Sequence, residues 1–233
     1  MNLVRSLLFV PFLYLSMVVI GVGGLPLMVT RRSAMWVIKA WACTAIWGAR
    51  WICGIRIEVR GLEHAPKGAA LVGAKHQSML DTLWPFTVFD TAIFVLKKEL
   101  MWTPVLGWYA WRVNMIPVDR SAAAAALKKM VRDTRERLKD DCQIVIYPEG
   151  TRTKPGADAD YKPGVAALYR DLGDVPCHLV ATNSGVRWPA SGILRTPGTV
   201  VFEFLEPIPP GLKRGAFMEQ LQTRIETASK ALL

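Results

Sequence analysis

The sequence predicts an α/β fold, in which a mixed, largely parallel central sheet is covered by helices and preceded by an N-terminal two-helix membrane-associated motif. Short apolar runs alternate with helical patterns along residues 56–233, which is typical of one α/β domain. An uncharged stretch fills residues 6–30, and 52% of the chain is hydrophobic, with nine tryptophans. At 233 residues the chain is long enough for one sizeable core, so one globular domain is expected.

The N-terminal stretch "SLLFVPFLYLSMVVIGVGGLPLMVT" (residues 6–30) carries no charge over 25 residues. As a helix it would reach about 37 Å, which exceeds the roughly 30 Å hydrocarbon core of a bilayer. Pro11 and the glycine- and proline-containing run 21–26 interrupt the pattern, which also allows a shorter helix followed by a turn within the interface. The sequence therefore leaves a full span and a re-entrant hairpin open.

The next segment, residues 33–57, mixes aromatic residues with cations. Its tryptophans are Trp36, Trp41, Trp47 and Trp51. This mixture favours a helix that lies at the level of the lipid headgroups. The basic residues Arg31, Arg32 and Lys39 place the rest of the chain on the cytoplasmic side by the positive-inside rule. We therefore predict membrane-associated helices over residues 1–55 and a globular domain over residues 56–233.

The net charge of +10 is compatible with two kinds of partner. A basic surface binds nucleic acid, or it holds a protein against anionic lipid, where each nearby cation contributes about 1 kcal/mol. The apolar N-terminus favours lipid, and the basic residues show neither zinc-finger spacing nor an RNA-binding signature. The expected partner is therefore a membrane bilayer and not nucleic acid. The four cysteines lack CxxC spacing, which predicts buried free thiols and no metal site.

The remaining elements are predicted in order along the chain. After an extended segment and a turn at 54–68, strands are predicted at 69–74, 92–96, 114–118, 143–148, 178–182 and 199–204. Most are continuous apolar runs, as expected of strands covered on both faces. Helical patterns lie near 81–90, 100–111, 121–140, 163–171 and 214–232. Ser121 is a favourable N-cap for its helix, and the final amphipathic helix is interpreted as structural.

Polar residues gather where the predicted strands end. His76 and Asp81 follow the first strand, Lys97 the second, Arg120 the third, and "EGTR" (149–152) the fourth. Loops at strand ends in α/β sheets converge on one crevice, which is where ligand sites commonly form. These residues are therefore candidates for a single site.

His76 and Asp81 lie five positions apart, which in a regular helix corresponds to about 140° of rotation. They meet only if His76 sits in the turn before the helix that Asp81 begins. The carboxylate then accepts from one ring nitrogen and leaves the other as a base. Spacing alone also fits a polar surface pair or a helix cap. A G-x-S-x-G elbow is absent, so the substrate itself is a candidate source of the attacking hydroxyl.

The segment "YPEGTRT" has the composition of an anion-binding turn. Gly150 permits a tight turn, Thr151 offers a hydroxyl, and Arg152 offers a planar fork that matches phosphate. Lys97 and Arg120 are further candidates for the same anion site. A solvated surface charge is the alternative interpretation of each cation.

The blocks "KHQSMLD", "LKKELMWTPVLGW", "MIPVDR" and "YPEGTRT", in this order, resemble those of the glycerolipid acyltransferase family, which includes 1-acyl-sn-glycerol-3-phosphate acyltransferases. The resemblance runs from about residue 56 to residue 210, and the N-terminal pair of membrane-associated segments is also similar to bacterial members. H-x-x-x-x-D alone is a weak signal, but with I-x-V-D-R and E-G-T-R behind it the signal is strong.

The resemblance implies direct acyl transfer at the cytoplasmic face of a bacterial inner membrane. His76 would take the proton from the free hydroxyl of a lysophospholipid, and Asp81 would orient and stabilise the imidazolium. The block Glu149, Gly150, Thr151 and Arg152 would bind the acceptor, with Lys97 and Arg120 helping to hold its phosphate. Acyl-carrier protein or coenzyme A would bring the acyl thioester as co-substrate, with no bound cofactor, and the product would be phosphatidic acid.

Two departures from the family pattern and three rival functions accompany this expectation. Lys75 stands where the family often has Asn, and Leu179 stands where its fourth block usually has a proline. The nearest rival is an acyltransferase for another lysolipid, such as a lyso-ornithine lipid. A thioesterase or lipase that uses water is a second, and a non-catalytic membrane-binding protein is a third. The intact His76, Asp81 and Arg152 argue against the third.

Overall fold

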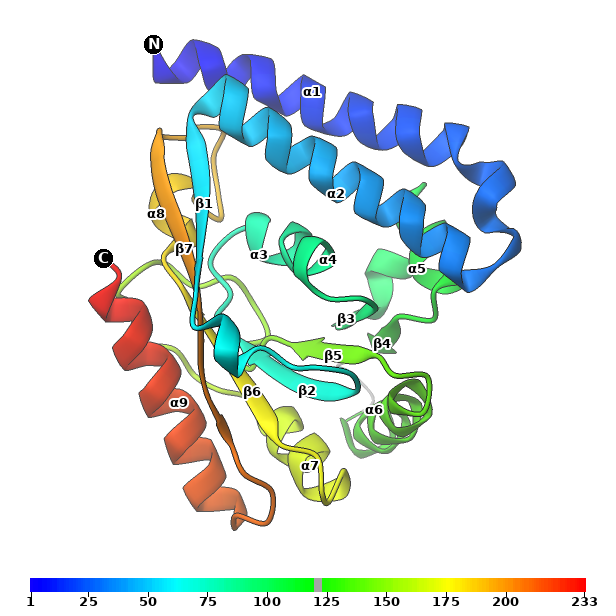
Figure 1. Ribbon diagram of the computed structural model, residues 1–233, viewed down its shortest axis with the longest axis vertical. Helices are drawn as coiled ribbons and strands as arrows, with labels where there is room; N and C mark the ends of the chain where they lie inside the picture. Colours follow the sequence, from blue (N-terminus) through cyan, green and yellow to red (C-terminus); the bar gives the residue numbers. More distant parts are fainter. Residues whose placement is uncertain (120–122) are drawn as a thin grey trace.

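The computed structural model describes residues 1–119 and 123–233, and its centre is a seven-stranded sheet with the order β1-β7-β6-β2-β5-β3-β4 (Figure 1). The strands are β1 (Ile55–Arg60), β2 (Ala70–Ala74), β3 (Ala92–Lys97), β4 (Ile116–Val118), β5 (Gln143–Ile146), β6 (Cys177–Thr182) and β7 (Gly198–Ile208). β6 and β7 pair antiparallel, and the other neighbouring strands pair parallel. The prediction of a mixed, largely parallel sheet is confirmed.

The central strands are buried on both faces, as their continuous apolar sequences predict. Every residue of β2 and of β5 is buried. The edge strand β1 instead alternates, with Ile55, Ile57 and Val59 turned inward between the charged residues of "IRIEVR". This alternation explains why the sequence predicts the segment only as extended, since it lacks the apolar run of its neighbours.

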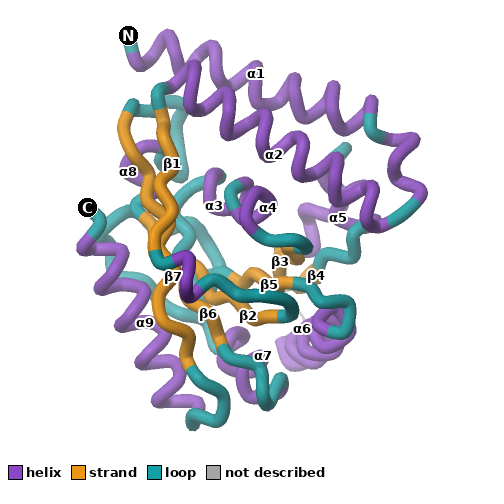
Figure 2. The backbone as a smooth tube through the Cα atoms, in the orientation of Figure 1, coloured by secondary structure: helices purple, strands orange, loops and turns teal. Residues whose placement is uncertain are grey.

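Helices cover both sides of the sheet (Figure 2). They are α1 (Asn2–Gly23), α2 (Arg31–Cys53), α3 (Leu80–Leu83), α4 (Pro85–Val88), α5 (Leu106–Arg112), α6 (Ala123–Leu138), α7 (Gly164–Asp171), α8 (Ser184–Arg187) and α9 (Arg214–Ala231), with short 3-10 segments η1 (Leu25–Val29), η2 (Leu62–His64) and η3 (Lys98–Trp102). One layer contains α6, α7 and α9. The opposite layer contains α3, α4 and α5 beneath the α1–α2 pair (Figure 1).

Two of the predicted helices are divided in the structure. The predicted helix near 81–90 consists of α3 and α4, because Pro85 lacks the N–H that would continue the hydrogen bonding of α3. The predicted helix near 100–111 consists of η3 and α5, with Pro104 between them. Arg120 and Ser121 lie outside the described residues.

The N-terminal hairpin consists of α1, η1 and α2. α1 continues through Pro11 and ends at Gly23, so the glycine-rich run makes the turn and Pro11 does not. Thr30 then caps α2 in a capping box with Ser33. The helices approach closely where Gly48 faces the ring of Phe12, since a Cβ at Gly48 would lie 2.1 Å from Phe12 Cε1. Among the described helices, α1 is the one long and apolar enough to cross a membrane by length and composition.

The hairpin is also where the prediction for cysteines differs from the structure. All four cysteines are free thiols, and Cys53, Cys142 and Cys177 are buried as predicted. Cys43 is exposed, because it lies on the side of α2 turned away from the domain.

Candidate active site

The loop between β2 and α3 brings His76 and Asp81 together. His76 lies two residues after β2 ends, and Asp81 occupies the first turn of α3. His76 Nδ1 lies 3.1 Å from Asp81 Oδ2, and the same oxygen accepts from the backbone N–H groups of Gln77 (2.6 Å) and Ser78 (2.7 Å). Asp81 is buried, and three donors converge on one of its oxygens. This is the arrangement that the five-residue spacing requires.

The contact with Asp81 determines which ring nitrogen of His76 faces the cavity without a proton. A carboxylate only accepts hydrogen bonds, so in the neutral imidazole Nδ1 carries the proton and Nε2 keeps its lone pair. The ring of Tyr147 stacks on the imidazole with centroids 4.0 Å apart. The imidazole of His76 is 11% exposed and lines a cavity, so its free nitrogen remains accessible to a ligand. His76 thus has the surroundings of a general base.

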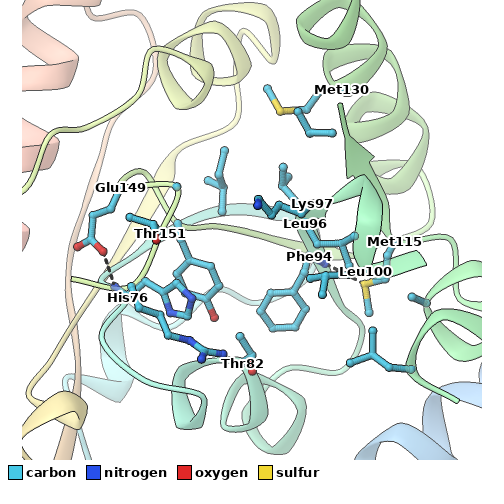
Figure 3. Close-up of a pocket in the computed structure, with 18 of the residues that line it drawn as sticks. His76, Thr82, Phe94, Leu96, Lys97, Leu100, Met115, Met130, Glu149 and Thr151 are labelled. Carbon is cyan, nitrogen blue, oxygen red and sulfur yellow. Dashed lines mark hydrogen bonds between the residues drawn. The ribbon is translucent and has the colours of Figure 1, made fainter. Parts of the chain in front are cut away.

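The "EGTR" segment follows β5 and packs against the His76 loop. Gly150 adopts a positive φ of 69°, which glycine allows without a Cβ clash. Glu149 Oε2 accepts a hydrogen bond of 3.2 Å from His76 N, drawn as a dashed line in Figure 3. On the other side of the peptide chain, Thr153 N donates to His76 O at 2.9 Å. The backbone of His76 is therefore held from both sides by one loop.

A buried ion cluster that the sequence did not predict lies behind this loop. Lys75 Nζ lies 2.8 Å from Glu149 Oε1 and 2.6 Å from Glu226 Oε1, and Glu226 comes from α9. Tyr161 also donates to Glu226 Oε1, at 3.0 Å. Burial raises the pKa of Glu149 to about 7, while the Lys75 ammonium and the hydrogen bond from His76 N oppose this rise.

The predicted cations Lys97 and Arg152 line the same cavity as His76. Both side chains are exposed, and neither forms an ion pair with the described residues. The neighbouring Lys98 differs, because its ammonium pairs with Asp119 at 3.1 Å. Thr151 and Gly150 also line the cavity. Arg120 lies outside the described residues.

The cavity has a volume of about 1210 Å³, larger than the roughly 300–1,000 Å³ of common ligand pockets. In Figure 3 the polar residues His76, Glu149 and Thr151 lie at one end, and Leu100 and Met115 lie at the other. Away from the polar end its walls are mostly apolar and come from the hairpin, the helices below it and α6. They include Met17, Val37, Phe86, Val105, Tyr109 and Met130. The described residues contain no group of three or more His, Cys, Asp and Glu placed to hold a metal.

A family model described as Acyltransferase matches residues 56–183, more than half of the chain. The chain belongs to the acyltransferase family. All the sequence-predicted site residues of this acyltransferase lie inside the match, whereas the hairpin helices and Glu226 lie outside it.

Named relatives agree with this assignment. The acyltransferase is 35% identical over 200 residues to a 1-acyl-sn-glycerol-3-phosphate acyltransferase of Pseudomonas aeruginosa, covering 84% of this chain and 77% of that protein. It is 30% identical over 161 residues to an enzyme of the same name from Limnanthes douglasii, covering 68% of this chain and 56% of the longer plant protein. The crystal structure of the 1-acyl-sn-glycerophosphate acyltransferase PlsC from Thermotoga maritima shares the fold, with a TM-score of 0.79 at 23% identity, covering 100% of this chain and 98% of that chain.

Proposed function

We propose that this acyltransferase moves an acyl group from an acyl thioester to the free hydroxyl of 1-acyl-sn-glycerol-3-phosphate, giving phosphatidic acid. The observation that carries the proposal is the position of the His76–Asp81 pair on a large apolar cavity that Lys97 and Arg152 also line. The site thus has a base, two cations without an ion-pair partner among the described residues, and room for a hydrocarbon chain. These features match a lysolipid with a phosphate headgroup. The names of the Pseudomonas and Limnanthes relatives support the same acceptor.

In the proposed reaction, His76 Nε2 removes the proton of the acceptor hydroxyl while that oxygen attacks the thioester carbonyl carbon. The tetrahedral intermediate then collapses, the carbon–sulfur bond breaks, and the imidazolium returns the proton to the departing thiolate. Asp81 stabilises the imidazolium through Nδ1. Such a base contributes about 10²- to 10⁴-fold in rate.

The acceptor phosphate is assigned to the rim of the cavity. Arg152 and Lys97 supply two positive charges there, Arg120 follows the cavity-lining Asp119 in the chain, and Gly150 and Thr151 supply polar groups of the turn. Glu149, which is expected to bind the acceptor, lines the cavity, and its carboxylate also contacts Lys75 Nζ and His76 N. We therefore assign Glu149 to holding the acceptor-binding turn in place.

Membrane attachment is assigned to residues 1–55, with residues 56–233 as the catalytic domain. α1 exposes an apolar face, which includes Leu3, Leu7, Leu8, Leu15, Val18 and Val19. α2 packs its inner face on the domain and exposes Trp36, Trp47 and Trp51. This packing supports a hairpin that lies in one leaflet of the bacterial inner membrane rather than one that spans it. The cytoplasmic face suits a donor carried by acyl-carrier protein or coenzyme A.

The test uses the purified full chain in detergent with lysophosphatidic acid and either acyl-CoA or acyl-carrier protein thioester, read by lipid mass spectrometry. Phosphatidic acid should form with wild type and be lost in His76→Ala. His64→Ala is the matched control, because His64 is a surface histidine 37% exposed in its side chain. If the wild-type protein acylated only a phosphate-free lysolipid, the proposed acceptor would be wrong. If it only released free fatty acid, the proposed transferase activity would be wrong.

A further inference from the structure

The buried ion cluster of Lys75, Glu149 and Glu226 connects the C-terminal helix to the catalytic loop. The side chains of Lys75 and Glu149 are each 1% exposed, and that of Glu226 is 14% exposed. Lys75 Nζ bridges the two carboxylates at 2.8 and 2.6 Å. Glu149 then accepts from His76 N with its other oxygen. A continuous path of polar contacts therefore leads from α9 to the backbone of His76.

We propose that Lys75 and Glu226 are positioning residues for acyl transfer: Lys75 holds Glu149 as the carboxylate that anchors the backbone of His76, and Glu226 holds the Lys75 ammonium in place. The inference rests on the proposed role of His76 as the base. Neither Lys75 nor Glu226 lines the cavity in which the reacting atoms would lie. Both act through Glu149, which joins the His76 loop to the turn that carries Arg152.

The direction of the side chains explains why Lys75 serves this role. Lys75 continues the line of β2, since its N–H donates to Val180 O of β6 at 2.9 Å. Successive residues of an extended chain point to opposite faces. His76 accordingly lines the cavity beneath the hairpin, and Lys75 reaches to α9 on the other side of the sheet. The dipeptide Lys75–His76 therefore places the imidazole on one face of the sheet and the ammonium on the other.

The charges of the cluster explain why the ammonium is needed. Burial disfavours an ionised Glu149 and raises its pKa, the Glu226 carboxylate raises it further, and Lys75 lowers it. Among the described residues, Glu149 also faces the titratable groups His76, Tyr147 and Tyr161. Without Lys75, two carboxylates would share a site with no cation between them, and one of them would take up a proton. A protonated Glu149 is a weaker acceptor for His76 N.

The test compares pH profiles of kcat for Glu226→Gln and Lys75→Met with wild type. Removing the negative charge of Glu226 favours the ionised form of Glu149, so Glu226→Gln should move the acid limb to lower pH. Removing the positive charge in Lys75→Met should move the acid limb to higher pH. The expected shift in each variant is about one pH unit. Lys75→Met should also lose about fivefold in kcat near pH 7, because the ionised fraction of Glu149 falls there, and should recover part of the loss above about pH 8.5.

Three controls keep the result interpretable. Glu219→Gln makes the same change at an exposed position of α9 and should leave the profile unchanged. The double variant Lys75→Met/Glu226→Gln should lie between the two single variants, because it removes one charge of each sign. Thermal unfolding identifies any variant that fails to fold, and Glu226→Gln, which keeps the size of the side chain, carries the test if Lys75→Met is unstable.

The outcomes separate this inference from the proposed function. If wild type does not acylate lysophosphatidic acid, the proposed function is wrong. If wild type is active and the acid limb of Glu226→Gln coincides with those of wild type and Glu219→Gln, the positioning role is overturned. Opposite shifts in the two single variants support it, because a purely structural contact would change the melting temperature without moving the limb in opposite directions.

Discussion

The ring of Tyr147 stacks on the imidazole of His76, with centroids 4.0 Å apart and 17° between the planes, while its hydroxyl donates a 2.6 Å hydrogen bond to the backbone oxygen of Asp81. Tyr147 comes directly after β5, so a residue fixed by the sheet contacts both members of the His–Asp pair. Desolvation raises the pKa of Tyr147, which keeps its hydroxyl protonated as a donor.

Replacement of Tyr147 should separate the effect of the ring from that of the hydroxyl. Tyr147→Leu should lower kcat about threefold to tenfold, because aromatic stacking contributes about 0.5–1.5 kcal/mol to the position of the imidazole. Tyr147→Phe keeps the ring and should lose less. Steady-state kinetics at saturating acceptor gives both values. Equal losses in the two variants would assign the effect to the hydroxyl instead.

Replacement of the cavity cations should weaken acceptor binding more than catalysis. Arg152→Ala and Lys97→Ala should each raise the KM for lysophosphatidic acid about tenfold to a hundredfold, because each removes a charge-assisted contact worth about 1.5–3 kcal/mol. Arg170→Ala, at an exposed position of α7, is the matched control. A similar rise in KM for a phosphate-free acceptor would contradict a phosphate contact.

The raised pKa of Glu149 should make the stability of the protein depend on pH. The carboxyl has a pKa of 4.5 when unperturbed and about 7 in the folded chain, so the folded state binds more protons between these values. The free energy of unfolding should therefore fall as pH rises through this window, by on the order of 3 kcal/mol from this group.

Glu149→Gln removes that titration and isolates its effect. Urea unfolding in detergent at about pH 4.5, 6 and 8 should show a decline for wild type that is smaller in the variant. Parallel pH curves for the two proteins would mean that Glu149 keeps an ordinary pKa in the folded state.

A second exposed aromatic surface should contribute to membrane binding. Trp102 in η3 is 82% exposed and Trp111 in α5 is 71% exposed. Trp102→Ala/Trp111→Ala should lower the partition coefficient onto anionic vesicles by at least about tenfold, since a tryptophan brings a large apolar area to the interface. Vesicle co-sedimentation measures this. The Phe/Phe double variant should retain most binding, and unchanged binding of the Ala/Ala variant would place both residues outside the interface.

Much of the fold was predictable because the central strands are buried on both faces and have continuous apolar sequences. The prediction was weaker where local signals conflict with periodicity. Pro85 and Pro104 divide segments whose apolar pattern continues past them. β1 alternates charged and apolar residues because it lies at the edge of the sheet, so its membership in the sheet depends on β7, which is distant in the sequence.

The site was predictable only as far as its residues follow the strands. His76, Lys97, Arg152 and the turn at Gly150 line one cavity because parallel strands end at one edge of the sheet. Glu226 gave no such signal, since a glutamate in an amphipathic helix is ordinarily a solvated charge. Glu226 differs from a solvated glutamate because it pairs with Lys75. Only the packing of α9 against the sheet brings these two residues together.

The hairpin forms one wall of the cavity through Met17, Gly21, Val37 and Ile38, while the opposite side of α1 exposes leucines and valines. With that side in the bilayer, as proposed, only the hairpin helices α1 and α2 separate the cavity from the hydrocarbon of the membrane. A lipid tail that passes directly from the bilayer into the cavity is not exposed to water. Exposing the tail to water would cost about 0.8 kcal/mol per methylene, or about 11 kcal/mol for a chain of about fourteen methylenes. Substrate supply then depends on the mole fraction of lysolipid in the surface rather than on its bulk concentration. Dilution with inert lipid at constant total lysolipid should therefore slow the enzyme.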